Sequence, residues 1–276
     1  MENKNISILL SLYDKEKPEY LKEALASIFE QTVMPAEIVL VYDGPINEKL
    51  QAVVTYFQQK VPHLFTGVKL EKNQGLGIAL ATGLEHTKNR LVARMDTDDI
   101  MEPHRLEKQL EIFQEYPEIA IVGSNIEEFT GTLSNVIGRR IVPEYNDEIR
   151  VFSKRRNPFN HMTVMFDKNA ILEVGNYRPL IGFEDYYLWV RLLKAGYKGY
   201  NIQEILVHAR AGADMYARRG GSKYLLPGIK GRYRVWKDGL GSLKDFLIVI
   251  CGHLVISLLP NKIRGKVYES KLRKTN

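Results

Sequence analysis

The stretch EIVLVYD at residues 37–43 is an apolar run that ends in an aspartate, and it is the clearest indication of the fold class. A strand whose residues are nearly all apolar is typical of a parallel sheet covered by helices on both faces. IAIVG at 119–123 has the same character. Further strand-like runs lie at 6–13, 67–72 and 90–96.

Amphipathic patterns separate these runs and predict helices at 18–31, 47–60 and 76–88, and from Pro103 through Glu115. This alternation predicts right-handed crossovers, and hence an α/β fold with a mostly parallel central sheet flanked by helices. Ligands of such sheets bind beyond the carboxyl ends of the strands. The polar residues at or just past such an end are Tyr13, Asp43, Asn73 and the cluster Asp96–Asp99.

The pattern after residue 130 is more mixed. HMTVMFDK (161–168) and KGYNIQEILVHA (198–209) are predicted strands, and FEDYYLWVRLLKAG (183–196) is a predicted helix that Gly196 closes. From residue 210 onward, a Gly- and Arg-rich loop precedes basic helical segments. We therefore expect one domain at 1–209 and a separate C-terminal region at 210–276.

The charge of the chain is unevenly distributed. Residues 1–209 hold 24 Lys and Arg against 29 Asp and Glu, whereas residues 210–276 hold 15 against 4. This asymmetry predicts an anionic partner for the C-terminal region. No zinc-finger spacing, homeodomain pattern or RRM-type aromatic motif accompanies the charge, so a membrane surface or phosphate groups are favoured over nucleic acid.

Cysteine usage and the first residues bear on the compartment. The single Cys251 excludes an intramolecular disulfide and suits a reducing environment. The apolar run ISILLSL at 6–12 has no small-residue cleavage site after it, and we interpret it as a buried strand rather than a secretory signal. A cytoplasmic protein is expected.

The stretch ARMDTDD at 93–99 places three carboxylates within four positions of a predicted strand end. Such carboxylates repel one another unless a cation or hydrogen-bond donors neutralise them. Mg²⁺ and Mn²⁺ prefer carboxylate oxygens, often combined with substrate phosphates. Alternatively, Asp98 or Asp99 is only the N-cap of the helix expected near Pro103.

ARMDTDD resembles the D-x-D motif of nucleotide-sugar glycosyltransferases with the GT-A fold, and the wider chain resembles glycosyltransferase family 2. Five segments carry this resemblance over roughly the first 200 residues: SILLSLYDKEKPEYLKEALASIFEQT (7–32), EIVLVYDGP (37–45), KNQGLGIALATGL (72–84), ARMDTDD (93–99) and GFEDYYLWVRL (182–192). The segments LLSLYDKEKPEYL, NPFNHMTVMF and MYARRGG look most like the bacterial branch that builds O-antigen, capsule and amylovoran-type exopolysaccharides.

The resemblance implies a donor site. Tyr13 would stack on the base, and Asp43 would accept a hydrogen bond from the uracil N–H, although its position before Gly44 and Pro45 also fits a simple turn residue. The residues that would approach the nucleotide or its ribose are Asn73, Gly75, Arg94 and Asp96. Arg94 is equally interpretable as a strand-end charge.

The resemblance also implies a Mn²⁺ or Mg²⁺ site with Asp98 as direct ligand, Asp96 at the metal or ribose and Asp99 behind them. His208 would be a third metal ligand, as a late histidine is in several GT-A enzymes; its apolar neighbours also fit a purely structural strand residue. Arg218 and Arg219 would close over the diphosphate, where guanidinium geometry suits phosphate, or form a solvated surface pair.

The segment GFEDYY (182–187) would carry the catalytic base. An inverting transfer needs a base that removes the acceptor hydroxyl's proton opposite the leaving diphosphate. By resemblance this base is Asp185, with Glu184 orienting sugar hydroxyls. The alternative is a first-turn or capping acid of the following helix. His161 would contact the substrate or serve a structural purpose beside its strand.

The segment FLIVICGHLVISLLP (246–260) is apolar but shorter than the roughly 20 residues that a spanning helix needs. Basic residues flank it, which is typical of a segment lying in the interface of an anionic bilayer. A core or dimer helix is the alternative.

Together these features predict an inverting, metal-dependent glycosyltransferase at the cytoplasmic face of the cell membrane. It would move a sugar from a UDP-sugar to a polyprenyl-diphosphate-linked glycan in bacterial surface polysaccharide biosynthesis. The catalytic domain at 1–209 would comprise a nucleotide-binding part at about 1–130 and an acceptor part at about 131–209. Two alternative functions are a sugar-1-phosphate nucleotidyltransferase, which the glycine-free SLYDKEKPEY (11–20) disfavours, and a non-enzymatic membrane scaffold.

Overall fold

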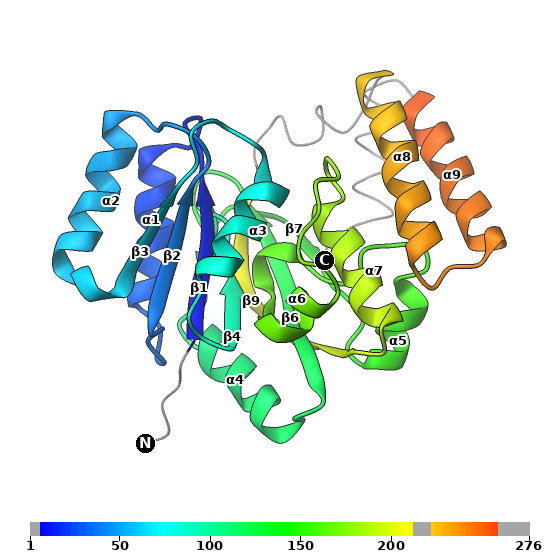
Figure 1. Cartoon of the computed structure of the whole chain (residues 1–276), viewed down its shortest axis with the longest axis horizontal. Coiled ribbons are helices and arrows are strands. Elements are labelled where there is room, and N and C mark those ends of the chain that lie inside the picture. Colours follow the sequence, from blue (N-terminus) through cyan, green and yellow to red (C-terminus); the bar gives the residue numbers. More distant parts are fainter. Residues whose placement is uncertain (1–5, 212–221, 259–276) are drawn as a thin grey trace.

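The computed structural model describes residues 6–211 and 222–258 (Figure 1). The strands of these residues are β1 (Ile6–Leu12), β2 (Glu37–Tyr42), β3 (Phe65–Lys69), β4 (Leu91–Arg94), β5 (Ile100–Met101), β6 (Ile119–Phe129), β7 (Val136–Arg140), β8 (Met165–Asp167) and β9 (Lys198–Arg210). They form one sheet in the order β3-β2-β1-β4-β8-β6-β9-β5, and β7 pairs with β6 outside this path.

The sheet is mixed and mostly parallel. β3, β2, β1 and β4 are joined by parallel pairs, and β6 and β9 form another parallel pair. β8 lies antiparallel between β4 and β6, so these two strands run in the same direction. The predicted α/β class and its mostly parallel sheet are confirmed.

Helices cover both faces of the sheet. They are α1 (Pro18–Phe29), α2 (Glu48–Lys60), α3 (Leu76–His86), α4 (Arg105–Glu115), α5 (Asn146–Phe152), α6 (Lys168–Glu173), α7 (Glu184–Lys194), α8 (Ser222–Asp238) and α9 (Leu243–Leu258), with short 3-10 turns η1 (Pro62–Leu64) and η2 (His161–Thr163). One buried cluster joins the sheet to α1, α2 and α4, and a second joins it to α3, α5, α6 and α7.

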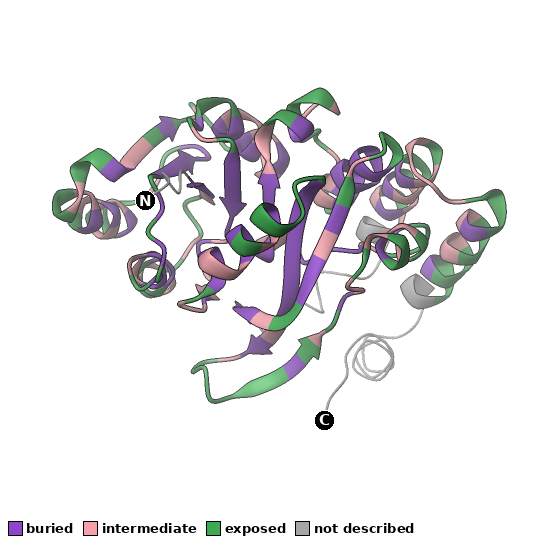
Figure 2. Ribbon diagram, turned by 90° about the horizontal axis from the view of Figure 1, so that it is seen from below, coloured by how far each residue is buried: buried purple, intermediate pink, exposed green. Residues whose placement is uncertain are grey.

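β2 shows why the strands read as continuous apolar runs. Ile38 and Leu40 belong to the first buried cluster, whereas Val39 and Val41 belong to the second. All four side chains are fully buried because successive residues of a strand point to opposite faces, and both faces are covered. Figure 2 shows the sheet as mainly buried, with exposed residues on the outer sides of the helices.

The parallel strands bring their carboxyl ends to one edge of the sheet. In the register of β1 with β2, Leu12 lies opposite Tyr42, and β4 also runs parallel to β1. Tyr13, Asp43 and Asp96 follow directly after these strands, so the fold brings them to the same edge. The ligand edge expected from the sequence therefore exists.

Two predicted strands differ from the structure. The segment 161–168 is a strand only from Met165 to Asp167, because it begins with the turn η2, in which the Thr163 hydroxyl donates to the Asn160 carbonyl. Asp167 then caps α6 by accepting from the Asn169 N–H. The strand expected at 67–72 is β3, which begins at Phe65 after η1 and ends at Lys69, where the chain turns toward α3.

The C-terminal helices pack on the first domain. Val235 of α8 shares a buried cluster with α7 residues Tyr186, Tyr187 and Val190, and with Phe183 just before α7. α9 lies beside α8 (Figure 1). In the described part of the chain, no helix has the length and apolarity needed to cross a membrane. Division into separate regions at residue 209 stays a prediction.

Candidate active site

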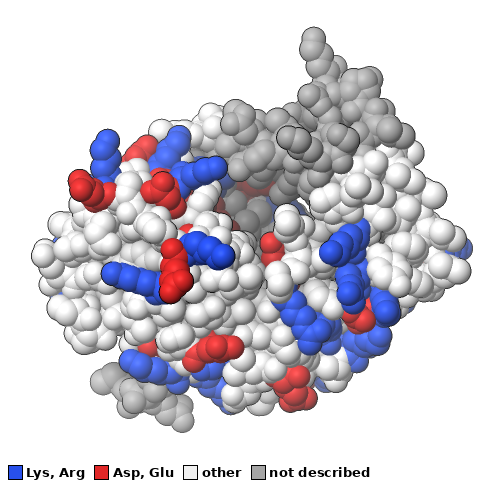
Figure 3. Space-filling view, turned by 45° about the horizontal axis from the view of Figure 1, so that its top comes forward, with Lys and Arg blue, Asp and Glu red and all other residues white. Residues whose placement is uncertain are grey.

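Three carboxylates gather directly after β4. Asp96, Asp98 and Asp99 each place an oxygen within 4.8 Å of the others. Figure 3 shows acidic atoms within a hollow of this face of the molecule. Because β5 lies between this cluster and α4, and α4 begins at Arg105 after His104, neither Asp98 nor Asp99 caps that helix. The capping alternative is therefore wrong.

The cluster is electrostatically unfavourable by itself. Burial raises the pKa of Asp98 to about 7, and the charges of Asp96 and Glu16 add to this rise. Burial and the charges of Asp96 and Asp98 also raise the pKa of Asp99 well above its ordinary value. Glu16 is held beside the cluster by the hydroxyl of Thr97, which donates to it at 2.9 Å.

The cluster fits a hard divalent cation. Oδ1 of Asp99 accepts from the Arg210 N–H at 2.8 Å, whereas its Oδ2 is buried without a hydrogen-bond donor among the described residues. An oxygen of this kind, next to two further carboxylates, has the charge and ligand chemistry that Mg²⁺ or Mn²⁺ requires. Asp96, Asp98 and Asp99 are the residues that could hold the ion.

Two buried arginines lie behind the acidic cluster. Arg94, at 1% exposure, makes a bidentate ion pair with Asp96, including a 2.7 Å bond from Nη1. Burial raises the pKa of Asp98 and Asp99, and the charge of Arg94 opposes this rise. Arg105 donates from Nη2 to the Arg94 carbonyl at 2.7 Å. Arg94 thus contacts Asp96 from inside the protein, and its predicted contact with a nucleotide stays a prediction.

Asp43 fixes the loop before α3. Its two carboxylate oxygens accept from the backbone N–H groups of Gln74 at 2.7 Å and Gly75 at 3.0 Å. Asn73 in turn donates to the Asp43 carbonyl at 3.3 Å. Gly44 makes this approach possible because it has φ +88°, and a Cβ there would lie 2.6 Å from the Asn73 nitrogen. Asp43 is therefore a turn residue and also an anchor for the predicted donor loop.

Asp185 lies in the first turn of α7 beside a second acidic residue, Glu184. Its Oδ2 accepts from the Asn157 amide at 2.6 Å. Burial raises the pKa of Asp185, and the hydrogen bonds from Tyr186 and Asn157 and the charges of Arg140 and Arg94 oppose this rise. Burial also raises the pKa of Glu184, its neighbour. A carboxylate with a raised pKa at a helix start is suited to accept a proton.

The first turns of α3 and α7 lie close together. A Cβ on Gly77, in the first turn of α3, would lie 2.9 Å from Cγ of Glu184 in α7. The N-termini of α3 and α7 therefore pack against each other at Gly77, where there is no room for a Cβ. Arg94 also acts across this junction, because its charge opposes the raised pKa of both Asp98 and Asp185.

The two predicted histidines have structural partners. Nε2 of His161 lies 3.0 Å from the Tyr177 hydroxyl, and its ring packs against Trp189. Burial lowers the pKa of His161, so this ring is neutral. His208 pairs through Nε2 with Glu102 and lies 3.6 Å from Glu127, and the group of candidate ligands around Asp98 does not include it. The third-ligand prediction for His208 is therefore not supported by its contacts.

The remaining predicted residues lie at the rim or outside the described chain. Tyr13 is 38% exposed just past β1. Arg218 and Arg219 lie outside the described residues, and their role stays a prediction.

Sequence reasoning missed Asn157 and Arg105. Asn157 bonds Asp185 across 28 positions, which no local pattern could reveal. Arg105 had a detectable signal, because it shares the buried face of α4 with Leu106, Gln109 and Leu110. A cation on the apolar side of an amphipathic helix indicates a specific internal partner.

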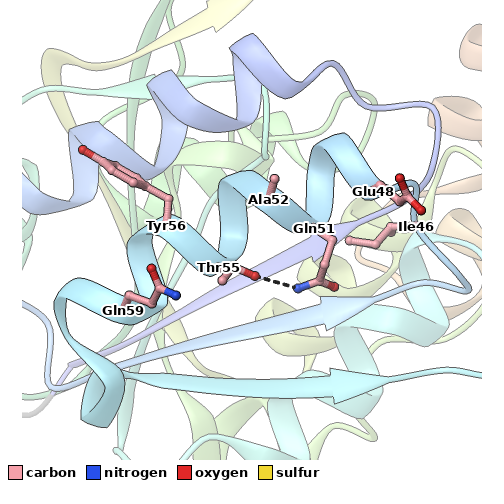
Figure 4. Close-up of a pocket in the computed structure, with 7 residues that line it drawn as sticks. All are labelled: Ile46, Glu48, Gln51, Ala52, Thr55, Tyr56 and Gln59. Atoms are coloured by element: carbon pink, nitrogen blue, oxygen red, sulfur yellow. Dashed lines mark hydrogen bonds between the residues drawn. The ribbon is translucent and has the colours of Figure 1, made fainter.

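A surface hollow lies away from these groups. It has a volume of about 540 Å³ and follows α2, and two of its lining residues, Gln51 and Thr55, are joined by a hydrogen bond (Figure 4). Its lining residues come from α2 and the turn before it, and no acidic cluster residue is among them. The candidate site is therefore the carboxyl edge of the sheet and not this hollow.

Comparison with known proteins places this site in a family context. A family model described as glycosyl transferase family 2 matches residues 7–178. The amylovoran biosynthesis glycosyltransferase AmsE of Erwinia amylovora is 39% identical over 264 residues, covering 95% of this chain and 97% of that protein. A UDP-Gal:alpha-D-GlcNAc-diphosphoundecaprenol beta-1,3-galactosyltransferase of Escherichia coli is 36% identical over 271 residues, covering 97% and 96%.

A solved structure supports the fold. The mannosyltransferase PcManGT from Pyrobaculum calidifontis, in complex with GDP-Man and Mn²⁺, superposes with a TM-score of 0.65 at 16% identity. The alignment covers 94% of this chain and 71% of that chain. At this identity the likeness concerns the fold alone.

Proposed function

Because the chain belongs to glycosyl transferase family 2 and has the GT-A fold, we propose that it is an inverting, metal-dependent transferase. It moves a sugar from a UDP-sugar to a lipid-linked glycan during synthesis of a bacterial surface polysaccharide. The relatives named for amylovoran synthesis and for a diphosphoundecaprenol acceptor support this substrate class.

One observation carries the proposal. The start of α3, beside the donor loop, meets the start of α7, beside Asp185, at Gly77 and Glu184. A transferase needs the donor's anomeric carbon and the acceptor's base at a fixed separation. In this proposal, the contact between the two helix starts at Gly77 and Glu184 fixes that separation.

The donor would bind across the ends of β1, β2 and β4. Tyr13, 38% exposed at the end of β1, would stack on the nucleobase, and the loop anchored by Asp43 would bring the Gln74 and Gly75 backbone close to the nucleotide. Each Asp43 oxygen has a further lone pair, so Asp43 can also accept from the uracil N–H. Arg218 and Arg219 are proposed to contact the diphosphate.

Asp96, Asp98 and Asp99 would hold Mn²⁺ or Mg²⁺. When bound, the cation supplies Lewis-acid stabilisation of the charge that develops on the leaving diphosphate. Arg94 orients Asp96 through its two hydrogen bonds, and the Arg210 N–H orients Asp99. These contacts keep the carboxylates in place before the cation arrives.

Asp185 would remove the proton of the attacking hydroxyl. The Asn157 amide donates to Oδ2 of Asp185 at 2.6 Å, and because each carboxylate oxygen has two lone pairs, the group can also accept from the acceptor hydroxyl. Glu184 lies beside it and can accept hydrogen bonds from sugar hydroxyls. Because its burial raises its pKa, Asp185 is a stronger base than an exposed carboxylate.

Peripheral membrane attachment would bring the enzyme to such an acceptor. α9 exposes Leu243, Leu247, Cys251 and Val255, which are spaced by four and share one helix face. This apolar stripe and the basic C-terminal composition support contact with the cytoplasmic leaflet.

A panel of nucleotide-sugars tests the proposal. Purified protein should release UDP from one UDP-sugar, and it should do so with Mn²⁺ or Mg²⁺ and not with a chelator. Asp98→Ala should lose metal-dependent UDP binding in calorimetry, whereas the matched change Asp14→Ala, on the exposed loop after β1, should retain it. Formation of a nucleotide-sugar from a sugar-1-phosphate and UTP, or inactivity toward every donor, would contradict the proposal.

A further inference from the structure

Arg210, the last residue of β9, has a buried side chain that contacts the acidic cluster. This side chain is only 5% exposed. A buried guanidinium is costly unless its N–H groups find acceptors, and each of its three nitrogens has one here. Nε donates to the Asp98 carbonyl at 3.0 Å, Nη1 donates to the Gly131 carbonyl at 3.1 Å, and Nη2 pairs with the Glu23 carboxylate. The orientation of the guanidinium is therefore fixed by three separate acceptors.

Two aromatic rings also lie against this guanidinium. Cζ of Arg210 is 4.0 Å from the centroid of the Tyr20 ring and 4.5 Å from that of the Phe129 ring. Such a cation is attracted to the face of an aromatic ring. Tyr20 and Glu23 belong to α1, and Phe129 ends β6, opposite Arg210 in the register of β6 with β9. Arg210 thus joins α1 and the end of β6 to the loop that carries the acidic cluster.

The three acids of the cluster are held in two different ways. Asp96 and Asp99 accept through their carboxylate oxygens, from the Arg94 side chain and from the Arg210 backbone N–H respectively. Asp98 accepts from Nε of Arg210 through its backbone carbonyl, and this contact occupies none of the lone pairs of its carboxylate. A residue that binds a cation directly is best held in this way, because its ligand oxygens stay available for the ion.

We infer that the Arg210 side chain is a positioning residue for the divalent cation. It fixes the main chain at Asp98, so that the oxygens of the acidic cluster stay within 4.8 Å of one another before the ion arrives. This inference rests on the proposed function and adds to it a residue that lies 112 positions after Asp98. Groups that orient metal ligands from outside the coordination shell typically change metal affinity by about 10–100-fold.

The test measures binding of Mn²⁺ alone to the full chain, without nucleotide and at one pH, from the EPR signal of the free ion. Arg210→Gln should weaken binding by about tenfold or more. Arg210→Lys should lose as much, because an ammonium keeps the charge but cannot donate to three separate acceptors in a planar fork. Unchanged Mn²⁺ affinity in Arg210→Lys would overturn the inference, since charge alone would then suffice.

Arg191→Gln is the matched control for the loss of a buried arginine. Arg191 of α7 donates to the carbonyls of Tyr187, Val174 and Asn176, and its guanidinium lies 4.7 Å from the centroid of the Tyr187 ring. None of these contacts involves the acidic cluster, so this variant should lose thermal stability and keep its Mn²⁺ affinity. Equal losses of affinity in Arg191→Gln and Arg210→Gln, or no loss in Arg210→Gln, would overturn the inference.

Glu23→Gln tests the same contact if the Arg210 variants do not fold. The Glu23 side chain is 52% exposed, so its replacement should leave the fold intact while it loosens the Arg210 guanidinium. Mn²⁺ binding should weaken by about threefold, because an ion pair with one exposed partner is weak. Glu19→Gln removes the same charge from an exposed position on α1 and should bind like the unmodified protein. Equal effects in these two variants would contradict a role for the Arg210 contact.

Mn²⁺ binding by the unmodified protein separates this inference from the proposed function. If the unmodified protein binds no Mn²⁺, both fail. If it binds Mn²⁺ and the Arg210 variants bind the ion equally well, only the inference fails. If the variants follow the expected order but the unmodified protein releases UDP from no donor, the proposed function fails and the role of Arg210 in metal binding stands.

Discussion

Asp185 is subject to opposing influences that decide whether it can act as a base. Burial raises its pKa, while the Asn157 amide and the charges of Arg140 and Arg94 stabilise its ionised form. Glu184, one residue earlier, makes no such contact with an amide side chain within the described part of the chain. The chemical difference between the two acids therefore comes from residues outside α7.

Asp185→Asn should abolish transfer while leaving the donor site intact. Loss of a general base typically costs about 10²–10⁴ in rate. UDP binding with Mn²⁺, measured by calorimetry, should stay within about twofold, because Asp185 is not among the metal ligands. Glu184→Gln is the matched control and should retain more turnover than Asp185→Asn. Near-normal turnover in Asp185→Asn would remove it from the mechanism.

Most carboxylates of folded proteins have lowered pKa values, and the stability that they contribute is lost as the pH falls. The acidic cluster should show the opposite dependence, with stability lost as the pH rises. The pKa of Asp98 is about 7 in the folded protein and about 3.8 when unfolded. The folded state therefore binds more protons between these values, so the stability that Asp98 contributes is fully present below about pH 4 and is lost as the pH rises through about 7.

Thermal unfolding of the metal-free protein tests this dependence. The melting temperature should fall between about pH 6 and 8, and Asp98→Asn should flatten the fall because it removes the titrating group. Stabilisation by Mn²⁺ should show the reverse trend, since the ion binds the deprotonated carboxylates. A fall of unchanged size in Asp98→Asn would assign it to other groups.

Among the elements, those buried on both faces were predictable and those defined by long-range contacts were not. β2 was recognised because Ile38 through Val41 are all apolar. β5 has only two residues, Ile100 and Met101, and exists because it pairs with β9. β7 is largely exposed and pairs with β6 alone, so its sequence carries little apolar signal.

The residues of the candidate site also divide into those that local sequence predicts and those that depend on long-range contacts. The carboxylates at the strand ends and in the first turn of α7 were found from the sequence, because element boundaries fix their positions. Arg105 and Asn157 were not found, because their partners are far apart along the chain. The contact of His208 with Glu102 likewise depends on the pairing of β9 with β5.

The turn after β2 should be sensitive to substitution at Gly44. Gly44→Ala should weaken UDP binding, because its Cβ would clash with the Asn73 backbone and displace the loop from Asp43. It should also lower stability by about 1 kcal/mol or more, since φ is positive there.

Gly196→Ala is the control for backbone strain alone. Gly196 also has positive φ, at +97°, but a Cβ there meets nothing within 4 Å. This variant should lose stability and keep UDP affinity. Equal losses of affinity in the two variants would show that the Asp43 anchor is not the cause.

At the scale of the whole molecule, the exposed stripe of α9 should decide membrane attachment. Leu247→Glu/Val255→Glu should reduce co-sedimentation with phosphatidylglycerol vesicles by about tenfold or more, because each apolar side chain contributes about 1.5–3 kcal/mol when buried. Met34→Glu/Leu172→Glu changes exposed apolar residues elsewhere and should have little effect. Equal loss in both pairs would indicate general repulsion by the added charge.

The bare contact at Gly77 has a consequence for chimeric enzymes. A Cβ at Gly77 would lie 2.9 Å from Cγ of Glu184. A chimera that joins the α3 region of one relative to the α7 region of another should therefore pack correctly only if position 77 is glycine. A methyl group at Gly77 would push the first turns of α3 and α7 apart. Under the proposed function, it would thereby increase the distance between donor and acceptor.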